Sequence, residues 1–147
     1  MVPTLMHQQP TWRATASHSS DRAVRAFGTA GWSTLVPQEA GMWFQFELPA
    51  PVRLTELQFQ SGGAFGPPNA PPRPQPYARG YKVQVSLDGT TWSAPVAEGQ
   101  GTGPSMHIVF APVQAKFVRI TQTASVEGAP AWGIQQLQLY QILDVKR

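Results

Sequence analysis

The sequence predicts a single all-β domain, a sandwich or barrel of short strands. Three observations predict this fold class. Apolar residues alternate with polar ones in several segments, 13 Gly and 15 Pro gather largely between those segments, and no segment has a helical period. The 147 residues are enough to bury a hydrophobic core within one domain.

Five segments alternate in this way, and each is expected to form a strand with one buried face. They are "MWFQFEL" (42–48), "VRLTELQF" (52–59), "YKVQVSL" (81–87), "KFVRITQ" (116–122) and "QQLQLYQ" (135–141). The residues expected to face inward are Met42, Phe44, Phe46, Leu48, Tyr81, Val83, Val85, Leu87, Val118, Ile120, Leu137 and Leu139. The second segment changes phase between Leu54 and Leu57, which predicts a β-bulge.

Turn-forming residues separate these strands. The prolines of "LPAPV" (48–52) are expected to end one strand before the next begins. Asp88-Gly89 is a strong signal for a tight turn. The glycines of "GQGTG" (99–103) predict a flexible hairpin loop, because the helix that a dinucleotide-binding motif requires does not follow.

A proline-rich run, "SGGAFGPPNAPPRPQPYARGY" (61–81), lies near the middle of the chain and has the composition of a linker. The two or three strands on either side of it are too few to form a domain alone. The run is therefore expected to be a loop within one sandwich, and loops of such length are usually functional. A polyproline segment recognised by a partner protein is the alternative.

Charge and composition limit the classes of partner that can be expected. The net charge of +3 comes from scarce acidic residues, and the Lys and Arg residues form no basic stripe, so nucleic acid is not expected. The chain has no cysteine and no segment typical of a membrane span. Residues 1–11 lack the pattern of a signal peptide and are expected to be a leader or a tail left by cloning, ahead of a domain at 12–141 and a tail at 142–147.

Several segments, in one order, resemble a known family. They are "WRATAS" (12–17), "AFGTAGWST" (26–34), "GMWFQFELPAPVRLTELQF" (41–59), "RGYKVQVSLDGTTW" (79–92), "KFVRITQT" (116–123) and "IQQLQLY" (134–140). This pattern resembles the discoidin domain, also called the coagulation factor 5/8 type C domain, which overlaps the family 32 carbohydrate-binding modules. "QEAGMWFQFELP" and "PVAEGQG" look closest to copies in surface proteins of planctomycete-type bacteria.

The resemblance implies a jelly-roll β-sandwich of about eight mostly antiparallel strands, with ligand bound by loops at one end. Members bind sugars, phospholipid head groups or proteins, and are not enzymes by themselves. We therefore expect a monomeric, non-catalytic carbohydrate-binding module within a larger exported bacterial protein, located outside the cell or in the periplasm. The alternatives are a protein- or surface-interaction module, and an accessory domain that has lost its ligand.

Three loops are expected to carry the ligand site: residues 18–38, the proline-rich run, and "ASVEGAPAW" (124–132). Aromatic rings suit the apolar face of a sugar, and Arg, His and amide groups suit its hydroxyls. The ligand-binding candidates are Phe65, Asn69, Arg73, Tyr77, Arg79, Trp132, His18 and Gln38. Three have structural alternatives: Trp132 would close the end of the sandwich, Arg79 would brace its loop, and Asn69 would belong to a plain turn. Trp12, Trp32 and Trp92 are assigned to the core, and Trp43 to burial against the sheet.

Many family members hold a structural calcium in the loop after the first strand. The usual pattern there is Ala-x-Asp-Gly-x-x-x-Thr-x-Trp, with a Glu from the last strand. In this chain Phe27 precedes Gly28 directly, so the Asp is missing, and Gln136 stands where the Glu is expected. Calcium affinity depends largely on carboxylates. We therefore expect no metal and no other cofactor, with a structural calcium held by backbone carbonyls and neutral amides as the alternative.

Catalytic motifs are not found in the sequence. It has no Gly-x-Ser-x-Gly elbow, His-Glu-x-x-His motif or phosphate-binding loop. His7, His18 and His107 have no acidic neighbour at ligand spacing, and the carboxylates are dispersed. His18 stands beside Ser17, but neighbouring residues on a strand point to opposite faces, so this pair is not expected to act together.

Overall fold

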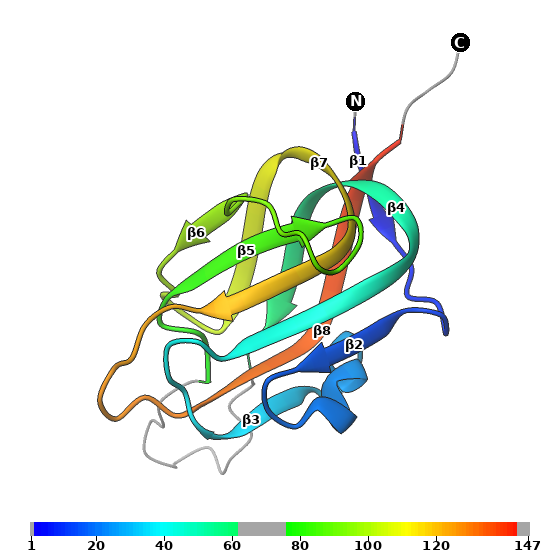
Figure 1. The fold of residues 1–147 in the computed structure, drawn as a ribbon. Helices are drawn as coiled ribbons and strands as arrows, with labels where there is room; N and C mark the ends of the chain where they lie inside the picture. The colour runs from blue at the N-terminus through cyan, green and yellow to red at the C-terminus, as the bar shows by residue number, and fades with distance from the viewer. Residues whose placement is uncertain (1, 62–75, 144–147) are drawn as a thin grey trace.

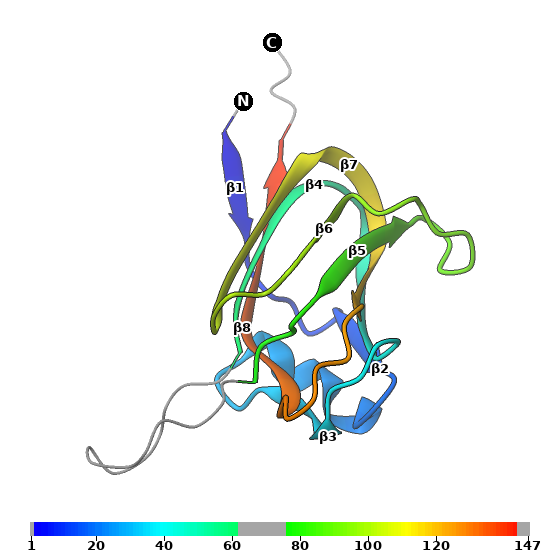
Figure 2. The same ribbon diagram turned by 90° about the vertical axis from the view of Figure 1, so that its left-hand side faces the viewer.

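Two long strands organise the sandwich, for which a computed structural model describes residues 2–61 and 76–143 (Figure 1). Strand β4 (Trp43–Gln60) and strand β7 (Ser105–Gln122) each have 18 residues and pair antiparallel along their length. Residues 43–47 pair with 117–121 in one layer, and residues 52–60 pair with 105–115 in the other. Both strands therefore bend from one layer into the other, as Figure 2 shows.

Shorter strands complete the two layers. Strand β2 (Arg13–Ala16) pairs with residues 44–47 of β4, strand β5 (Tyr81–Ser86) pairs with residues 117–122 of β7, and β6 (Ala97–Gly99) extends β5. In the other layer β8 (Ala131–Ile142) pairs with β4, β1 (Pro3–Met6) and β3 (Trp32–Pro37). All these pairings are antiparallel, so the expected eight-stranded antiparallel sandwich is confirmed.

The alternating segments bury the faces that the sequence indicates. Phe44, Leu48, Val83, Ile120 and Leu139 have no exposed surface, and most other residues expected to face inward are also buried. Tyr81 is only partly buried. Leu87 is the clear exception. It follows the end of β5 and is 57% exposed, because the alternation no longer applies once the strand has ended.

The sequence made two predictions for the segment that forms β4: a bulge where the alternation changes phase, and a strand end at the prolines. Only the first is confirmed. The phase change is a bulge, as predicted: the register shifts between Leu54 and Glu56, and the adjacent Leu54 and Thr55 are both buried. The expectation that "LPAPV" ends a strand is wrong, since β4 continues through it with a register shift between Glu47 and Val52. Proline lacks an N–H donor but remains compatible with extended backbone, so it interrupts the pairing while the chain bends.

A short helix was not expected from the sequence. The 3₁₀-helix η1 (Ser20–Phe27) follows β2 and packs against the sandwich through Ala23, Ala26 and Phe27. Phe27 meets Trp12 edge to face, with ring centroids 5.3 Å apart. A 3₁₀-helix repeats every three residues and here buries mainly small alanines, so its hydrophobic pattern in the sequence is weak.

An arginine and two tryptophan rings stack on the outer face of the layer that contains β2 and β5. The Arg119 guanidinium lies 4.9 Å from the Trp43 ring centroid and 4.4 Å from that of Trp92, and it donates to Gln45 Oε1. Trp12 and Trp32 are buried, as expected. The assignment of Trp92 to the core is wrong: the ring is partly exposed and stacks on a cation, which an amphipathic indole tolerates.

Residues before the expected domain start are part of the sheet. Pro3–Met6 form β1, which pairs with residues 139–142 at the edge of β8, whereas a leader was expected there.

The Asp88-Gly89 turn is present, and backbone N–H groups of Thr91 and Thr90, with Ser86 Oγ, hold the pKa of the Asp88 carboxyl well below its usual range. Within residues 2–61 and 76–143, no helix is long and apolar enough to span a bilayer.

Candidate functional site

The described parts of the three expected loops meet at one end of the sandwich, which we call the rim. In Figure 1 the rim lies at the end with β3 and the start of β8, opposite β1 and the end of β8. Gln38 connects all three loops. Its Nε2 donates to the carbonyls of Tyr77 and Pro130, and its Oε1 accepts from the backbone N–H of Arg79.

Gln38 is therefore a structural residue, and its assignment to ligand binding is wrong. Its side chain is only 3% exposed, and Oε1 also accepts from Gln122 Nε2. The Gln122 Oε1 in turn accepts from the N–H of Gly80 at 3.0 Å. Both the oxygen and the NH₂ group of the Gln38 amide are therefore hydrogen-bonded to protein groups, and neither is available to a sugar.

Tyr77 and Arg79 lie together on the rim and are both partly exposed. The Arg79 guanidinium stacks 3.7 Å from the Tyr77 ring centroid, and its Nη1 donates to the Tyr77 carbonyl at 2.8 Å. Arg79 thus braces its own loop, the alternative noted from the sequence. This contact leaves part of both side chains accessible at the rim.

Gly101 packs closely against residues 77–78, and this contact gives a testable prediction. A Cβ at Gly101 would lie 1.9 Å from the Ala78 carbonyl oxygen and 3.0 Å from Tyr77 Cδ2. Gly101→Ala must displace residues 77–78, and we expect it to lower the free energy of unfolding by about 1–3 kcal/mol, as overpacking does. Gly103→Ala is the control, because a Cβ there meets nothing within 4 Å. Equal urea midpoints for both variants would contradict the packing role.

Trp132 is fully buried, so the expectation that its ring is a sugar platform is wrong in this structure. The ring packs edge to face against Trp32, with centroids 5.1 Å apart, and the Trp132 backbone N–H donates to Thr34 Oγ1. The alternative that the sequence left open, closure of the sandwich end, describes its position.

His18 follows the end of β2 and is half-buried. Its carbonyl accepts from Trp32 Nε1 at 2.8 Å, and its Nδ1 lies 3.0 Å from Ser17 Oγ. The expectation that Ser17 and His18 point apart is wrong, because both lie beyond the strand, where alternation no longer applies. Ser17 Oγ accepts from the Trp43 N–H, which gives it a structural role. Three other candidates, Phe65, Asn69 and Arg73, lie outside the described residues.

A hollow of about 320 Å³ opens beside these loops, and we call it the rim hollow. Its lining includes Arg22, Arg25, Ser33, Leu35, Pro76 and Gln135. Arg22, Arg25, Ser33 and Leu35 lie within the expected 18–38 loop, but none of them was a ligand candidate from the sequence. The signal was weak, since charged residues in a segment without strand alternation usually indicate a solvated surface.

Leu35 is the most unusual residue of this lining. It has a left-handed backbone, with φ of 60°, and its side chain is 65% exposed. The register of β3 shifts between Ser33 and Pro37, and the bulge is held by a bond from Thr34 Oγ1 to the Val36 carbonyl and one from the Leu35 N–H to Ser33 Oγ. Bulges often reorient side chains near functional sites, and strained backbone clusters at such sites.

The position of the family's calcium site is lined by neutral groups. Gly28 and Gln136 border a second depression together with Thr29, Gln58 and Gln138. The Gly28 carbonyl, a potential metal ligand, accepts the backbone N–H of Gln136 at 3.0 Å. Calcium takes six to eight oxygens and relies on carboxylates. The lining supplies no carboxylate, so these residues do not fit a calcium ion.

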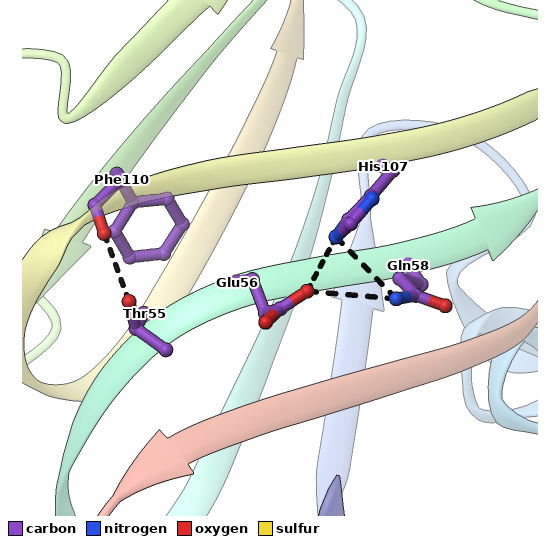
Figure 3. A network of polar contacts seen from close by, with 5 residues as sticks. All are labelled: Thr55, Glu56, Gln58, His107 and Phe110. Carbon is purple, nitrogen blue, oxygen red and sulfur yellow. Dashed lines mark hydrogen bonds and ion pairs between the residues drawn. The ribbon is translucent and has the colours of Figure 1, made fainter. Parts of the chain in front are cut away.

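His107 has an acidic neighbour that the sequence spacing did not reveal. Its Nε2 contacts Glu56 Oε2 across β4 and β7, beside the Gln58 amide (Figure 3). His107 is exposed, and among the described residues its ring contacts Glu56 and Gln58 but no hydroxyl or thiol nucleophile. Among the described residues, no three His, Cys, Asp or Glu side chains gather as metal ligands would. The pair is a cross-strand polar contact on the sheet face.

Comparison with known proteins identifies similar domains. The model of the F5/8 type C domain family matches residues 7–136. A search of the curated proteins finds no match.

Solved structures share the fold. An F5/8 type C domain from Bacteroides fragilis has 18% identity and a TM-score of 0.69, covering 95% of this chain and 96% of that one. A family 32 carbohydrate-binding module from Clostridium perfringens, solved with galactose, has 18% identity and a TM-score of 0.69, covering 95% and 100%. A chitosan-binding module of a chitosanase/glucanase from Paenibacillus sp. IK-5 has 25% identity and a TM-score of 0.67, covering 86% and 92%.

Proposed function

The chain belongs to the F5/8 type C domain family, and on this basis we propose that it is a non-catalytic module that binds glycans at the rim. The proposal includes its attachment to a larger exported bacterial protein. A chitosan-binding module is among the similar structures, which supports a sugar as the class of ligand.

The observation that carries the proposal is the rim hollow with Leu35 at its edge. A left-handed, non-glycine backbone costs about 1–2 kcal/mol, and an exposed apolar side chain gains nothing from burial in the free protein. Both costs are explained when the side chain packs against the C–H face of a sugar. Ser33 Oγ and the Gln135 amide lie in the same lining and offer hydrogen bonds to hydroxyl groups.

Tyr77 and Arg79 belong to the proposal as groups at the border of the hollow. Pro76 lines the hollow and directly precedes Tyr77, and its carbonyl accepts from the Gly133 N–H at 2.9 Å. A sugar extending beyond one ring would reach this edge. Stacking of Arg79 on Tyr77 would hold both in place before binding, which lowers the entropic cost of association.

Leu35→Gly tests this function. Glycine adopts the left-handed backbone without strain, so the variant should unfold at the same or a slightly higher urea concentration than the wild type. At the same time its affinity for glycans should fall, by about fivefold to tenfold for the loss of one apolar contact. The readouts are a glycan array followed by calorimetry with the oligosaccharides that bind.

Leu87→Ala is the matched control, since it removes another exposed leucine that does not line the rim hollow. Its glycan affinity should equal that of the wild type. If the wild-type domain binds no glycan on the array, the proposed function fails. In that case, capture of a partner protein would favour the alternative function, an interaction module.

A further inference from the structure

We propose that the rim hollow selects sugars that carry a negative charge, such as uronic acids or sulfated sugars. This inference rests on the proposed function and specifies its substrate class. It comes from the two arginines of the lining, Arg22 and Arg25, which nothing in the family match or the similar structures assigns to a ligand.

The geometry of η1 places the two arginines together. In a 3₁₀-helix, side chains three residues apart lie one above the other on the same face. Arg22 and Arg25 have this spacing in Ser20–Phe27, and both line the rim hollow. A different face of the helix carries Ala23 and Ala26, which are completely buried and anchor the helix, while Arg22 and Arg25 line the hollow.

Both guanidinium groups are exposed and without a protein partner within residues 2–61 and 76–143. The only acidic residue of η1, Asp21, is not part of the lining, and no Asp or Glu is. The segment from Gly62 to Gln75, which precedes Pro76, contains no acidic residue in its sequence. Two cations at neighbouring positions therefore repel each other, and an anion between them would relieve that repulsion.

Arginine also suits this role chemically. Its planar fork of N–H donors binds a carboxylate or a sulfate through two parallel hydrogen bonds. Leu35 and the neutral donors Ser33 and Gln135 would then contact the rest of the ring. A polycationic glycan such as chitosan would be repelled at the same place, so this chain should differ in its ligand from the chitosan-binding module that it resembles.

The experiment compares three matched oligosaccharides by calorimetry: trigalacturonic acid, its methyl ester, which is neutral, and a chitosan trimer, which is cationic. Galactose 6-sulfate distinguishes sulfate from carboxylate as the anion. We expect trigalacturonic acid to bind at least tenfold more tightly than its ester, from one charge-assisted contact, and this preference to weaken as salt is raised.

Two variants connect the preference to the arginines. Arg22→Gln/Arg25→Gln should remove the preference for the anionic sugar, so that trigalacturonic acid and its methyl ester bind this variant with equal affinity. Arg22→Lys/Arg25→Lys keeps the charge and should retain part of the preference. Arg13→Gln/Lys82→Gln removes two positive charges outside the hollow and is the control; it should bind like the wild type. Circular dichroism melting checks that each variant is folded.

The outcomes separate the two proposals. A wild-type domain that binds the ester as tightly as the acid, or a double Gln variant that keeps the preference, overturns the charge selection while the glycan-binding function stands. Equal loss of preference in the Arg13→Gln/Lys82→Gln control overturns it as well, because general attraction by net charge would then be the cause. Binding of no glycan in any charge class overturns both.

Discussion

Trp132→Ala is expected to lower the free energy of unfolding by about 3–5 kcal/mol, the range for deleting a large buried aromatic side chain. Trp132 has no exposed surface and meets Trp32 edge to face at the rim end of the core. Trp32 in turn packs on Phe44, with centroids 5.2 Å apart, so removal of the Trp132 ring leaves a cavity beside Trp32. Urea denaturation followed by far-ultraviolet circular dichroism measures the loss.

Trp132→Phe separates packing from polar effects at this position. The Trp132 Nε1 is buried and has no hydrogen-bond partner among the described residues. An unsatisfied buried donor is itself unfavourable, so phenylalanine removes that penalty while retaining most of the ring. The loss of stability should be clearly smaller than for alanine.

Trp92→Ala is the control for the same change at a partly exposed ring. Trp92 stacks on Arg119 at the outer face of the sheet, so it should cost much less stability than Trp132→Ala. A Trp132→Ala domain with wild-type stability and no glycan affinity would contradict burial and restore Trp132 as a contact residue. Because the substitution is expected to disturb the packing at the rim end of the core, loss of binding by itself would not show a sugar contact.

The strands could be predicted because one face of each strand is buried. With a period of two, each buried position repeats at every second residue, and Phe44 and Ile120 followed this pattern without exception. The bulge near Thr55 was visible for the same reason, as a break in phase. Continuity through Pro49 and Pro51 was not, because whether a strand bends or ends there depends on its partner β7 and not on the local sequence.

The candidate site was predicted less well, and the reason is distance along the chain. A buried glutamine and an exposed one look alike in sequence, and Gln38 is buried because its partners stand 39 and 92 residues away, at Tyr77 and Pro130. Arg22 and Arg25 became candidates only when η1 placed them over one hollow. Local patterns therefore located the loops, and the tertiary contacts decided which side chains of those loops are available.

Gln38→Leu is expected to lower the free energy of unfolding by about 3 kcal/mol, since it leaves several buried polar groups unpaired. Leucine has a similar size but neither donor nor acceptor. The carbonyls of Tyr77 and Pro130 lose their donor, and the Arg79 N–H loses its acceptor. Gln114→Leu, on the exposed side of β7, is the control and should change stability by less than about 0.5 kcal/mol.

Gln38→Glu tests whether the amide donors matter more than the shape of the side chain. The carboxylate keeps Oε1 as an acceptor but places a second oxygen against two carbonyls in a buried position, so it should be at least as destabilising as leucine at neutral pH. Wild-type stability in both variants would contradict the central position of Gln38.

The effect of Gln38 variants on binding should be indirect and spread over the rim. Gly80 depends on Gln122, which contacts Gln38, so loosening should appear as faster amide exchange at Gly80 as well as at Arg79. Trigalacturonic acid added to Gln38→Leu should slow that exchange, because a ligand that binds only the folded rim stabilises it. A direct sugar contact at Gln38 would predict the opposite pattern: weakened binding with unchanged exchange in the free domain.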